Sequence, residues 1–297
     1  RIGALEAGGT KMVCAVATEQ GEILERESFP TTTPDQSIPS LTRWFKERSV
    51  DALGIGAFGP TCVDPESPSF GTILETPKLP WRGYALRAAF VDALGVPVGY
   101  DTDVNVACLG EATFGDSRGI ADLVYVTIGT GVGAGVMCGG HLLHGMLHPE
   151  AGHMLLNRMP GDEGPCVCPS HDSCLEGLAA GPSIERRWGA KGTELADRAE
   201  VWELEASYLA QMCHNLVLCY SPRRIILGGG VMHQEQLYPL VRKKTLDYLG
   251  GYITAPELED IDSYIVAPSL NDNQGVLGCV ELGRRAAAGK EAYAPVP

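Results

Sequence analysis

The sequence contains a pattern of strand, glycine turn and second strand that occurs twice, and this pattern limits the folds open to the chain. In each copy a turn with Gly and Thr joins two short hydrophobic strands, predicted at Ile2–Leu5 and Met12–Val16 and again at Leu123–Ile128 and Ala134–Cys138. A shift of 120 residues places Gly9-Thr10 on Gly129-Thr130. The repeat predicts two similarly built lobes that face each other across a cleft.

Strands and helices alternate along the 297 residues, which favours an α/β fold over an all-α or all-β one. The polar stretch Asp116–Gly119 is a candidate domain boundary. The stretch with Pro30, Pro34 and Pro39 is predicted as a loop that leads into a helix. Near the other end, Ser263–Val266 is predicted as a strand.

Composition excludes several classes of function. The chain has 37 Asp and Glu against 23 Lys and Arg, a net charge of −14, which argues against binding to nucleic acid or to anionic membranes. No apolar run reaches the ~18 residues of a membrane helix, and no signal peptide is predicted. Six of the ten cysteines stand singly in apolar stretches, so we expect a reducing, cytoplasmic environment.

Three glycine turns follow hydrophobic strands and are candidates for phosphate binding, which needs backbone N–H groups that side chains do not shield. They are Gly8-Gly9-Thr10-Lys11, Gly129-Thr130-Gly131-Val132-Gly133 and Gly228-Gly229-Gly230. None matches a Walker A loop or a Rossmann fingerprint. A single turn of this kind is more simply a tight hairpin, but three together favour a nucleotide. Lys11 and Thr10 could add a cation and a hydroxyl to the phosphates.

Two carboxylates lie two residues apart in Tyr100–Asn105, where a predicted strand ends and a helix begins. Such residues cap helices well, and capping by Asp101, Thr102 or Asp103 is the simpler interpretation. A carboxylate at the end of a strand in a cleft is also suited to act as the base for a sugar hydroxyl.

A cluster of Cys and His has the spacing of metal ligands. It consists of His153, Cys166, Cys168, His171 and Cys174. Thiolates with imidazole select zinc, and four ligands complete a tetrahedral structural site, whereas disulfides are a poor alternative in a reducing compartment. We expect His153, Cys168, His171 and Cys174 to be the ligands, with Cys166 in reserve. A zinc site here would hold the flanking Glu150 and Glu176 rigidly, as a polyol pocket requires.

Together these segments resemble the ROK family of sugar kinases and repressors. The five matching segments, in order, are Glu6–Lys11, Asp103–Glu111, Thr127–Gly135, Glu150–His153 with the cysteines through Glu176, and Leu227–Val231. Each segment alone is modest evidence. All five in this order are highly specific.

Several departures point to one branch of the family. Many relatives have Asp where this chain has Glu6, and an Asn-Asp pair where it has Thr102-Asp103. The zinc loop is the histidine-containing Cys168–Cys174 rather than the common form with three cysteines and glycines. These features, and the segment Thr76–Trp81, resemble the bacterial fructokinase branch.

The resemblance implies a two-lobed sugar kinase of the actin-like ATPase, ribonuclease-H-like type, with ATP and sugar in the cleft. It places residues 1–115 and about 274–297 in a smaller lobe and residues 116–273 in a larger one. It further implies Mg²⁺, a structural Zn²⁺ and a homodimer. The expected activity is ATP-dependent phosphorylation of D-fructose to fructose 6-phosphate by in-line transfer.

The resemblance also implies roles for individual residues. Asp103 would be the general base, and Glu6 would be associated with Mg²⁺. ATP would contact the three turns, at Gly8, Gly9, Thr10, Lys11, Gly129, Thr130, Gly131, Gly133, Gly228, Gly229 and Gly230. The sugar would contact Gly59, Thr102, Asp103, Asn105, Glu150, His153 and Glu176.

Three alternatives stay open. A glucokinase, mannokinase or N-acetylhexosamine kinase of the same family differs only in the sugar pocket. A sugar-sensing ROK repressor would carry a DNA-binding segment ahead of the first turn, where this sequence has only Arg1–Leu5. A catalytically silent sugar-binding protein would not need Asp103 with three glycine turns.

Overall fold

The computed structural model describes residues 1–290 and divides the chain into two units. Unit 1 comprises Arg1–Ala121, Gly135–Pro149 and the chain from Ser269 onward, and unit 2 comprises Asp122–Ala134 and Glu150–Pro268. Three segments expected in the larger lobe, 116–121, 135–149 and 269–273, are therefore grouped with unit 1. The last seven residues of the expected smaller lobe, 291–297, lie outside the described part of the chain.

Unit 1 is built on a five-stranded mixed sheet in the order β3-β2-β1-β4-β5. Its strands are β1 (Ile2–Ala7), β2 (Lys11–Ala17), β3 (Ile23–Pro30), β4 (Ala52–Ala57) and β5 (Val98–Thr102). Strands β1, β4 and β5 are parallel, while β2 pairs antiparallel with both β1 and β3. Strand β3 was not predicted, because most of its residues are exposed and polar; as an edge strand, it is held by its backbone pairing with β2.

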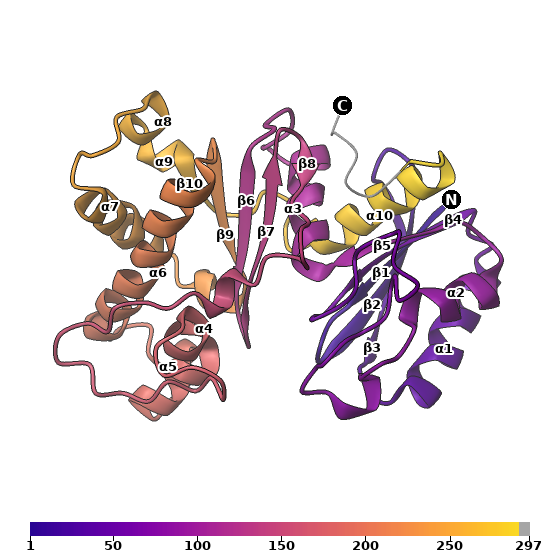
Figure 1. The fold of residues 1–297 in the computed structure, drawn as a ribbon, viewed down its shortest axis with the longest axis horizontal. Helices are drawn as coiled ribbons and strands as arrows, with labels where there is room; N and C mark the ends of the chain where they lie inside the picture. The colour runs from indigo at the N-terminus through magenta and orange to yellow at the C-terminus, as the bar shows by residue number, and fades with distance from the viewer. Residues whose placement is uncertain (291–297) are drawn as a thin grey trace. The chain divides into compact units, whose positions relative to one another are not determined.

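Helices cover both faces of this sheet (Figure 1). Its side chains alternate between the two faces and form two cores. One face packs on α1 (Pro34–Glu47) and α2 (Leu86–Leu94) through residues such as Ile55, Phe45 and Phe90. The other face packs on α3 (Asp103–Phe114) and α10 (Gln274–Ala287). The alternation follows from the two-residue period of a strand, so both sides of the first sheet are covered by helices.

The helix α10 lies unusually close to its neighbours. A Cβ built on Gly54 of β4 would lie 1.8 Å from the carbonyl oxygen of Cys279, and one built on Gly278 would lie 1.6 Å from that of Val106. No side chain fits at these distances, so glycine on both sides allows the backbones to approach. The end of the chain thereby completes the core that its beginning starts.

A second five-stranded sheet has the order β10-β9-β6-β7-β8. Its strands are β6 (Leu123–Ile128), β7 (Val132–Cys138), β8 (His141–Leu142), β9 (Arg224–Gly228) and β10 (Ile265–Val266), of which β8 and the end of β7 are grouped with unit 1. Strands β6, β9 and β10 are parallel. Each sheet thus has a glycine hairpin beside two further parallel strands, and the sequence repeat predicted the two hairpins.

The helices of unit 2 come mainly after the second hairpin. They are α4 (Leu175–Ala179), α5 (Gly181–Trp188), α6 (Ala199–Tyr220), α7 (Leu237–Leu249), α8 (Pro256–Glu259) and α9 (Ile261–Tyr264). The predicted strand Ser263–Val266 is wrong in its first half, because α9 runs to Tyr264 and only Ile265–Val266 pairs with β9. The expected α/β class is confirmed. Within residues 1–290, none of the helices has the length and apolarity needed to span a bilayer.

Candidate active site

The predicted catalytic and phosphate-binding segments of unit 1 meet at one edge of the first sheet. Ala7 at the end of β1 is paired with Ala57 of β4, and Ala57 is paired with Thr102 of β5. The Gly8–Lys11 turn, Gly59 and Asp103 directly follow these strand ends. The carboxyl edge of parallel strands is where α/β proteins bind their ligands, so the register brings these segments to a suitable place.

Asp103 is the first residue of α3. The alternative prediction was that Asp103 caps this helix, but Thr102 occupies the N-cap position. The Thr102 hydroxyl accepts a hydrogen bond from the Asn105 amide at 3.1 Å. One carboxylate oxygen of Asp103 accepts from the Val104 amide at 2.9 Å. The positive end of the α3 dipole favours a carboxylate here. Asp103 is half-buried.

Behind Asp103 lies a buried polar cluster whose histidine was not predicted. Asp101 is fully buried and accepts hydrogen bonds from the Thr102 amide and from Nδ2 of Asn105, both at 2.7 Å. Its second oxygen lies 2.9 Å from Nε2 of His144. Within residues 1–290, the buried Oδ1 of Asn105 has no hydrogen-bond partner. The cluster fixes the backbone just before Asp103 and leaves an acceptor for a ligand.

Glu6, expected near Mg²⁺, precedes the first glycine turn. Withdrawal from water raises the pKa of its carboxyl group, while the charges of Arg26 and Lys11 lower it. Within the described chain no hydrogen bond or ion pair involves the carboxylate. A hard oxygen donor without a protein partner fits the chemistry of Mg²⁺.

The four predicted zinc ligands come together in unit 2. One donor atom from each of His153, Cys168, His171 and Cys174 lies within 4.8 Å of the others. The sulfur of Cys168 is 3.3 Å from Nδ1 of His171 and 3.8 Å from Nδ1 of His153, and the sulfur of Cys174 is also 3.8 Å from the latter. Tetrahedral zinc places sulfur and nitrogen ligands roughly 3.5 Å apart, so this donor set fits the ion.

Cys166, the reserve ligand, has another role, because its thiol donates to the carbonyl oxygen of His171 at 3.0 Å. All ten cysteines are free, so no disulfide competes with metal binding. Burial, followed by the neighbouring Cys168 thiol, raises the pKa of Cys174 to about 12. A bound cation would reverse that preference and favour the thiolate.

The metal cluster is coupled to the predicted sugar residues through Cys174 and His153. Cys174 is the N-cap of α4, where its sulfur accepts from the Gly177 amide at 3.4 Å, and Glu176 lies in the first turn of that helix. His153 directs Nδ1 to the thiols and places Nε2 4.0 Å from Glu176. Glu176 also accepts from the Val132 amide at 3.0 Å. Glu150 directly precedes the short 3-10 helix Ala151–His153.

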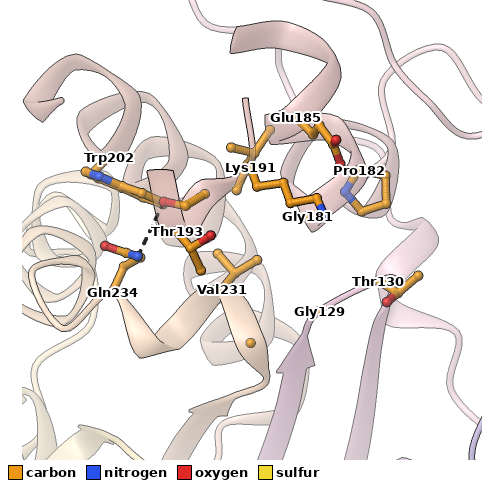
Figure 2. Close-up of a pocket in the computed structure, with 13 residues that line it drawn as sticks. Gly129, Thr130, Gly181, Pro182, Glu185, Lys191, Thr193, Trp202, Val231 and Gln234 are labelled. Atoms are coloured by element: carbon orange, nitrogen blue, oxygen red, sulfur yellow. Dashed lines mark hydrogen bonds between the residues drawn. The ribbon is translucent and has the colours of Figure 1, made fainter. Parts of the chain in front are cut away.

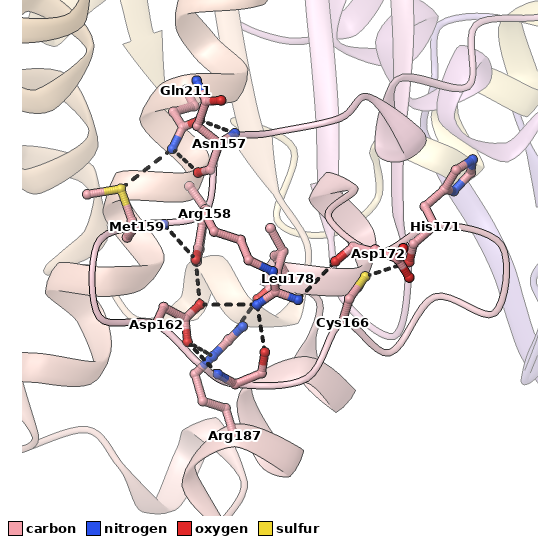
Figure 3. A network of polar contacts seen from close by, with 12 residues as sticks. Asn157, Arg158, Met159, Asp162, Cys166, His171, Asp172, Leu178, Arg187 and Gln211 are labelled. Atoms are coloured by element: carbon pink, nitrogen blue, oxygen red, sulfur yellow. Dashed lines mark hydrogen bonds and ion pairs between the residues drawn. The ribbon is translucent and has the colours of Figure 1, made fainter.

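A second network supports the loop before these ligands (Figure 3). Asp162, whose side chain is 4% exposed, accepts hydrogen bonds from the hydroxyl of Tyr208, from the Gly164 amide and from Arg187. Although burial would raise the pKa of Asp162, these partners outweigh it and lower the pKa. Arg158 spans the loop by donating to the carbonyl oxygens of Gly164 and Asp172. These contacts therefore support part of the loop through residues other than the four predicted ligands.

The second and third glycine turns border a cavity of about 530 Å³ in unit 2 (Figure 2). Thr127 of β6 pairs with Gly228 of β9, so both turns follow neighbouring parallel strands. Gly129, Thr130 and Gly230 line the cavity, whereas Gly131, Gly133, Gly228 and Gly229 are absent from its wall. The volume is in the range of small-molecule sites, so it can hold a nucleoside.

Most of the cavity wall was not predicted. The further lining residues are Gly181, Pro182, Ile184, Glu185, Lys191, Gly192, Thr193, Trp202, Val231 and Gln234. They combine an apolar surface with a few polar groups, as a base and ribose require. They come from α5, α6 and two 3-10 helices, Gly192–Glu194 and Gly230–His233, with Lys191 and Gln234 directly beside the last two. Of these residues, only Val231 belongs to a segment singled out in the sequence.

The comparison with known families agrees with this arrangement. A model described as the ROK family matches residues 2–286. The chain belongs to the ROK family. The resemblance inferred from the five motifs is thus confirmed, and the two mixed sheets have the actin-like ATPase fold of ROK sugar kinases.

Several ROK proteins are similar over their whole length. The chain is 44% identical over 285 residues to a fructokinase from Pediococcus pentosaceus, which covers 96% of this chain and 98% of the relative. It is 41% identical over 291 residues to a fructokinase from Streptococcus mutans, with 96% and 98% covered. Among solved structures, a ROK hexokinase from Thermus thermophilus matches with a TM-score of 0.78 and 25% identity, covering 97% and 99%.

Proposed function

We propose that this ROK protein is a fructokinase that transfers the γ-phosphoryl group of ATP to the 6-hydroxyl of D-fructose. The observation that carries the proposal is the position of Asp103 at the carboxyl edge of the first sheet, beside a glycine turn that follows a paired strand. The full-length similarity to two fructokinases supports fructose as the sugar.

The chemistry assigned to Asp103 is that of a general base. Its carboxylate accepts the proton of the 6-hydroxyl while that oxygen forms a bond to the γ-phosphorus, and the bond from phosphorus to the β,γ-bridging oxygen breaks. The products are fructose 6-phosphate and ADP. Thr102 and Asp101 hold the start of α3, so that the carboxylate is already oriented when the sugar binds.

We assign the nucleotide to the glycine turns and the unit 2 cavity. The base and ribose would occupy the cavity near Trp202 and Gln234, and N–H groups of the turns at Gly9 and Thr130 would bind phosphate oxygens. Mg²⁺, when bound, neutralises charge on the β- and γ-phosphates, and Glu6 would be its associated carboxylate. Glu6 supplies the oxygen donor that this ion prefers.

Zinc, when bound by His153, Cys168, His171 and Cys174, would be structural. Because Nδ1 of His153 faces the thiols, Nε2 is the nitrogen available to a sugar hydroxyl beside Glu176. Glu150 would bind a further hydroxyl. On unit 1, the unpartnered Oδ1 of Asn105 would accept a hydrogen bond from the sugar. Thr102 is near it in sequence, and Gly59 follows the strand whose last residue, Ala57, pairs with Thr102. We also infer a cytoplasmic homodimer from the family.

A coupled assay of ADP release with fructose, mannose, glucose and N-acetylglucosamine tests the proposal. The Thr102 hydroxyl stands where glucose-preferring relatives place an amide, so a pyranose loses a hydrogen bond worth ~1–3 kcal/mol. We expect kcat/KM for fructose to exceed that for glucose at least about tenfold. Equal kcat/KM values, or a higher value for glucose, would instead indicate a hexokinase that accepts several sugars. The solved ROK structure from Thermus thermophilus is named a hexokinase.

A further inference from the structure

The side chain of Lys78 lies against the first glycine turn. A Cβ built on Gly9 would be 2.8 Å from Cε of Lys78 and 3.6 Å from its ammonium nitrogen. Lys78 is half-buried, and within residues 1–290 its ammonium group makes no ion pair and no hydrogen bond to a protein acceptor. An unpaired cation held against a glycine turn is a site for an anion.

The backbone of Lys78 is fixed by its own loop. The Lys78 amide donates to the Thr76 hydroxyl at 3.4 Å, and its carbonyl oxygen accepts from the Trp81 amide at 2.8 Å. Trp81 is buried, and its ring packs edge-on against Phe58. The lysine therefore extends from an ordered stem rather than from a free loop.

The same short segment after β3 holds both the lysine loop and the glycine turn. The Trp81 indole donates to the carbonyl oxygen of Thr32 at 2.6 Å. The neighbouring Thr31 donates from its amide to Thr10 at 3.0 Å and from its hydroxyl to Gly8 at 2.7 Å. Two adjacent residues thus fix the lysine loop relative to the turn, which keeps the cation in place before any ligand binds.

We propose that Lys78 is a catalytic residue that contacts the phosphoryl group being transferred. This inference rests on the proposed kinase function and adds a residue to it. In the transition state negative charge spreads over the equatorial oxygens of that group, and a preorganised ammonium stabilises it there. The role of Lys78 is electrostatic, and it exchanges no proton with the substrates. Lys11 at the same turn is exposed, so its charge is screened by solvent to a greater extent.

The test compares Lys78→Met with Lys78→Arg and with the control Lys46→Met, whose lysine is exposed on α1. Methionine keeps the aliphatic cover over Gly9 but removes the charge, so a purely packing role would survive it. We expect Lys78→Met to lower kcat at least about 100-fold while KM for fructose stays nearly unchanged. Lys78→Arg should recover part of kcat, and Lys46→Met should match the wild type.

Binding measurements without sugar separate this inference from the proposed function. A charge-assisted contact contributes about 10- to 100-fold in affinity, so Lys78→Met should weaken binding of a non-hydrolysable ATP analogue by that factor and leave ADP binding unchanged. Equal losses for both nucleotides, or a loss confined to fructose 6-phosphate, would overturn the assignment to the transferred group. So would retention of more than a third of wild-type kcat. If the wild type does not phosphorylate fructose but Lys78→Met still weakens binding of the ATP analogue and not of ADP, only the choice of sugar is refuted.

Discussion

Nε2 of His144 lies 2.9 Å from Oδ2 of the buried Asp101 and joins the segment after β8 to the end of β5. Burial alone would lower the pKa of His144, but its hydrogen bond to Asp101 and the charge of that residue outweigh this effect, so the pKa is raised. Asp64 and Glu66 line the same cavity as His144. The protonated histidine is therefore the form that the fold stabilises.

The His144–Asp101 pair predicts a pH dependence of stability. Because the folded pKa is raised, the contribution is fully present below the unfolded value of about 6.5 and is lost as pH rises through the folded value. The free energy of unfolding of the wild type should therefore fall relative to that of His144→Gln between pH 6 and pH 8. Urea unfolding at several pH values measures this, with His214→Gln as the control. Parallel pH curves for wild type and His144→Gln would contradict the prediction.

Asp103→Asn tests the base. Asparagine keeps the size and the ability to accept from the Val104 amide, but it cannot take up the proton. We expect fructose binding to be nearly intact and kcat to fall by ~10²–10⁴. Asp92→Asn, on the exposed side of α2, is the matched control and should be silent. A variant with more than a tenth of wild-type turnover would remove Asp103 from this role.

Metal removal should act on the sugar and not on the nucleotide. Cys174→Ser is the informative variant, because serine still caps α4 but is a poor zinc ligand. It should lose the metal and raise KM for fructose at least about tenfold, with KM for ATP unchanged.

Two cysteines serve as controls for the metal. Cys166→Ser should keep the zinc, since this thiol donates to a carbonyl oxygen, and Cys213→Ser changes a buried cysteine of α6 away from the cluster. Elemental analysis should be done alongside the kinetics, and we expect it to give about one zinc per chain for the wild type and for both control variants. A metal-free protein with normal KM for fructose would end the zinc argument.

Substitution by valine should have different effects at the adjacent Gly229 and Gly230, on stability at the first and on ATP binding at the second. Gly229 has φ of 88°, and a Cβ there would lie 2.4 Å from the carbonyl oxygen of Ile128, so Gly229→Val should destabilise the fold by about 1–3 kcal/mol. A Cβ on Gly230 meets no atom within 4 Å and borders the cavity. Gly230→Val should keep stability but raise KM for ATP about tenfold. Thermal unfolding and ATP kinetics on both variants distinguish the two effects.

Segments with local spacing could be predicted, and contacts between distant segments could not. The cluster of candidate metal ligands could be predicted because His153 to Cys174 are near in sequence and their chemistry is distinctive. The contact of His144 with Asp101 could not be predicted, because the two residues are 43 positions apart in the sequence and only the fold brings them together. The choice of Cys168 over Cys166 was open in the sequence, and the structure groups Cys168 with the other donors.

The same reasoning explains the errors in the elements. Strand β3 was missed because its side chains, such as Glu25 and Glu27, face water and give no hydrophobic pattern; its backbone pairing with β2 determines the strand. The cavity wall was missed because Trp202 and Gln234 come from elements that serve mainly to pack unit 2. Periodicity reports burial, and neither case leaves a periodic signal.

The close approach of α10 to β4 has a consequence for folding during synthesis of the chain. The strands of unit 1 leave the ribosome first, yet Gly54 and its neighbours stay uncovered until Gln274–Ala287 has been made. At roughly 5–20 residues per second, that delay includes the synthesis of all of unit 2. Until then only α3 is available to cover that side of the nascent sheet, so the unit that starts first is the last to be finished.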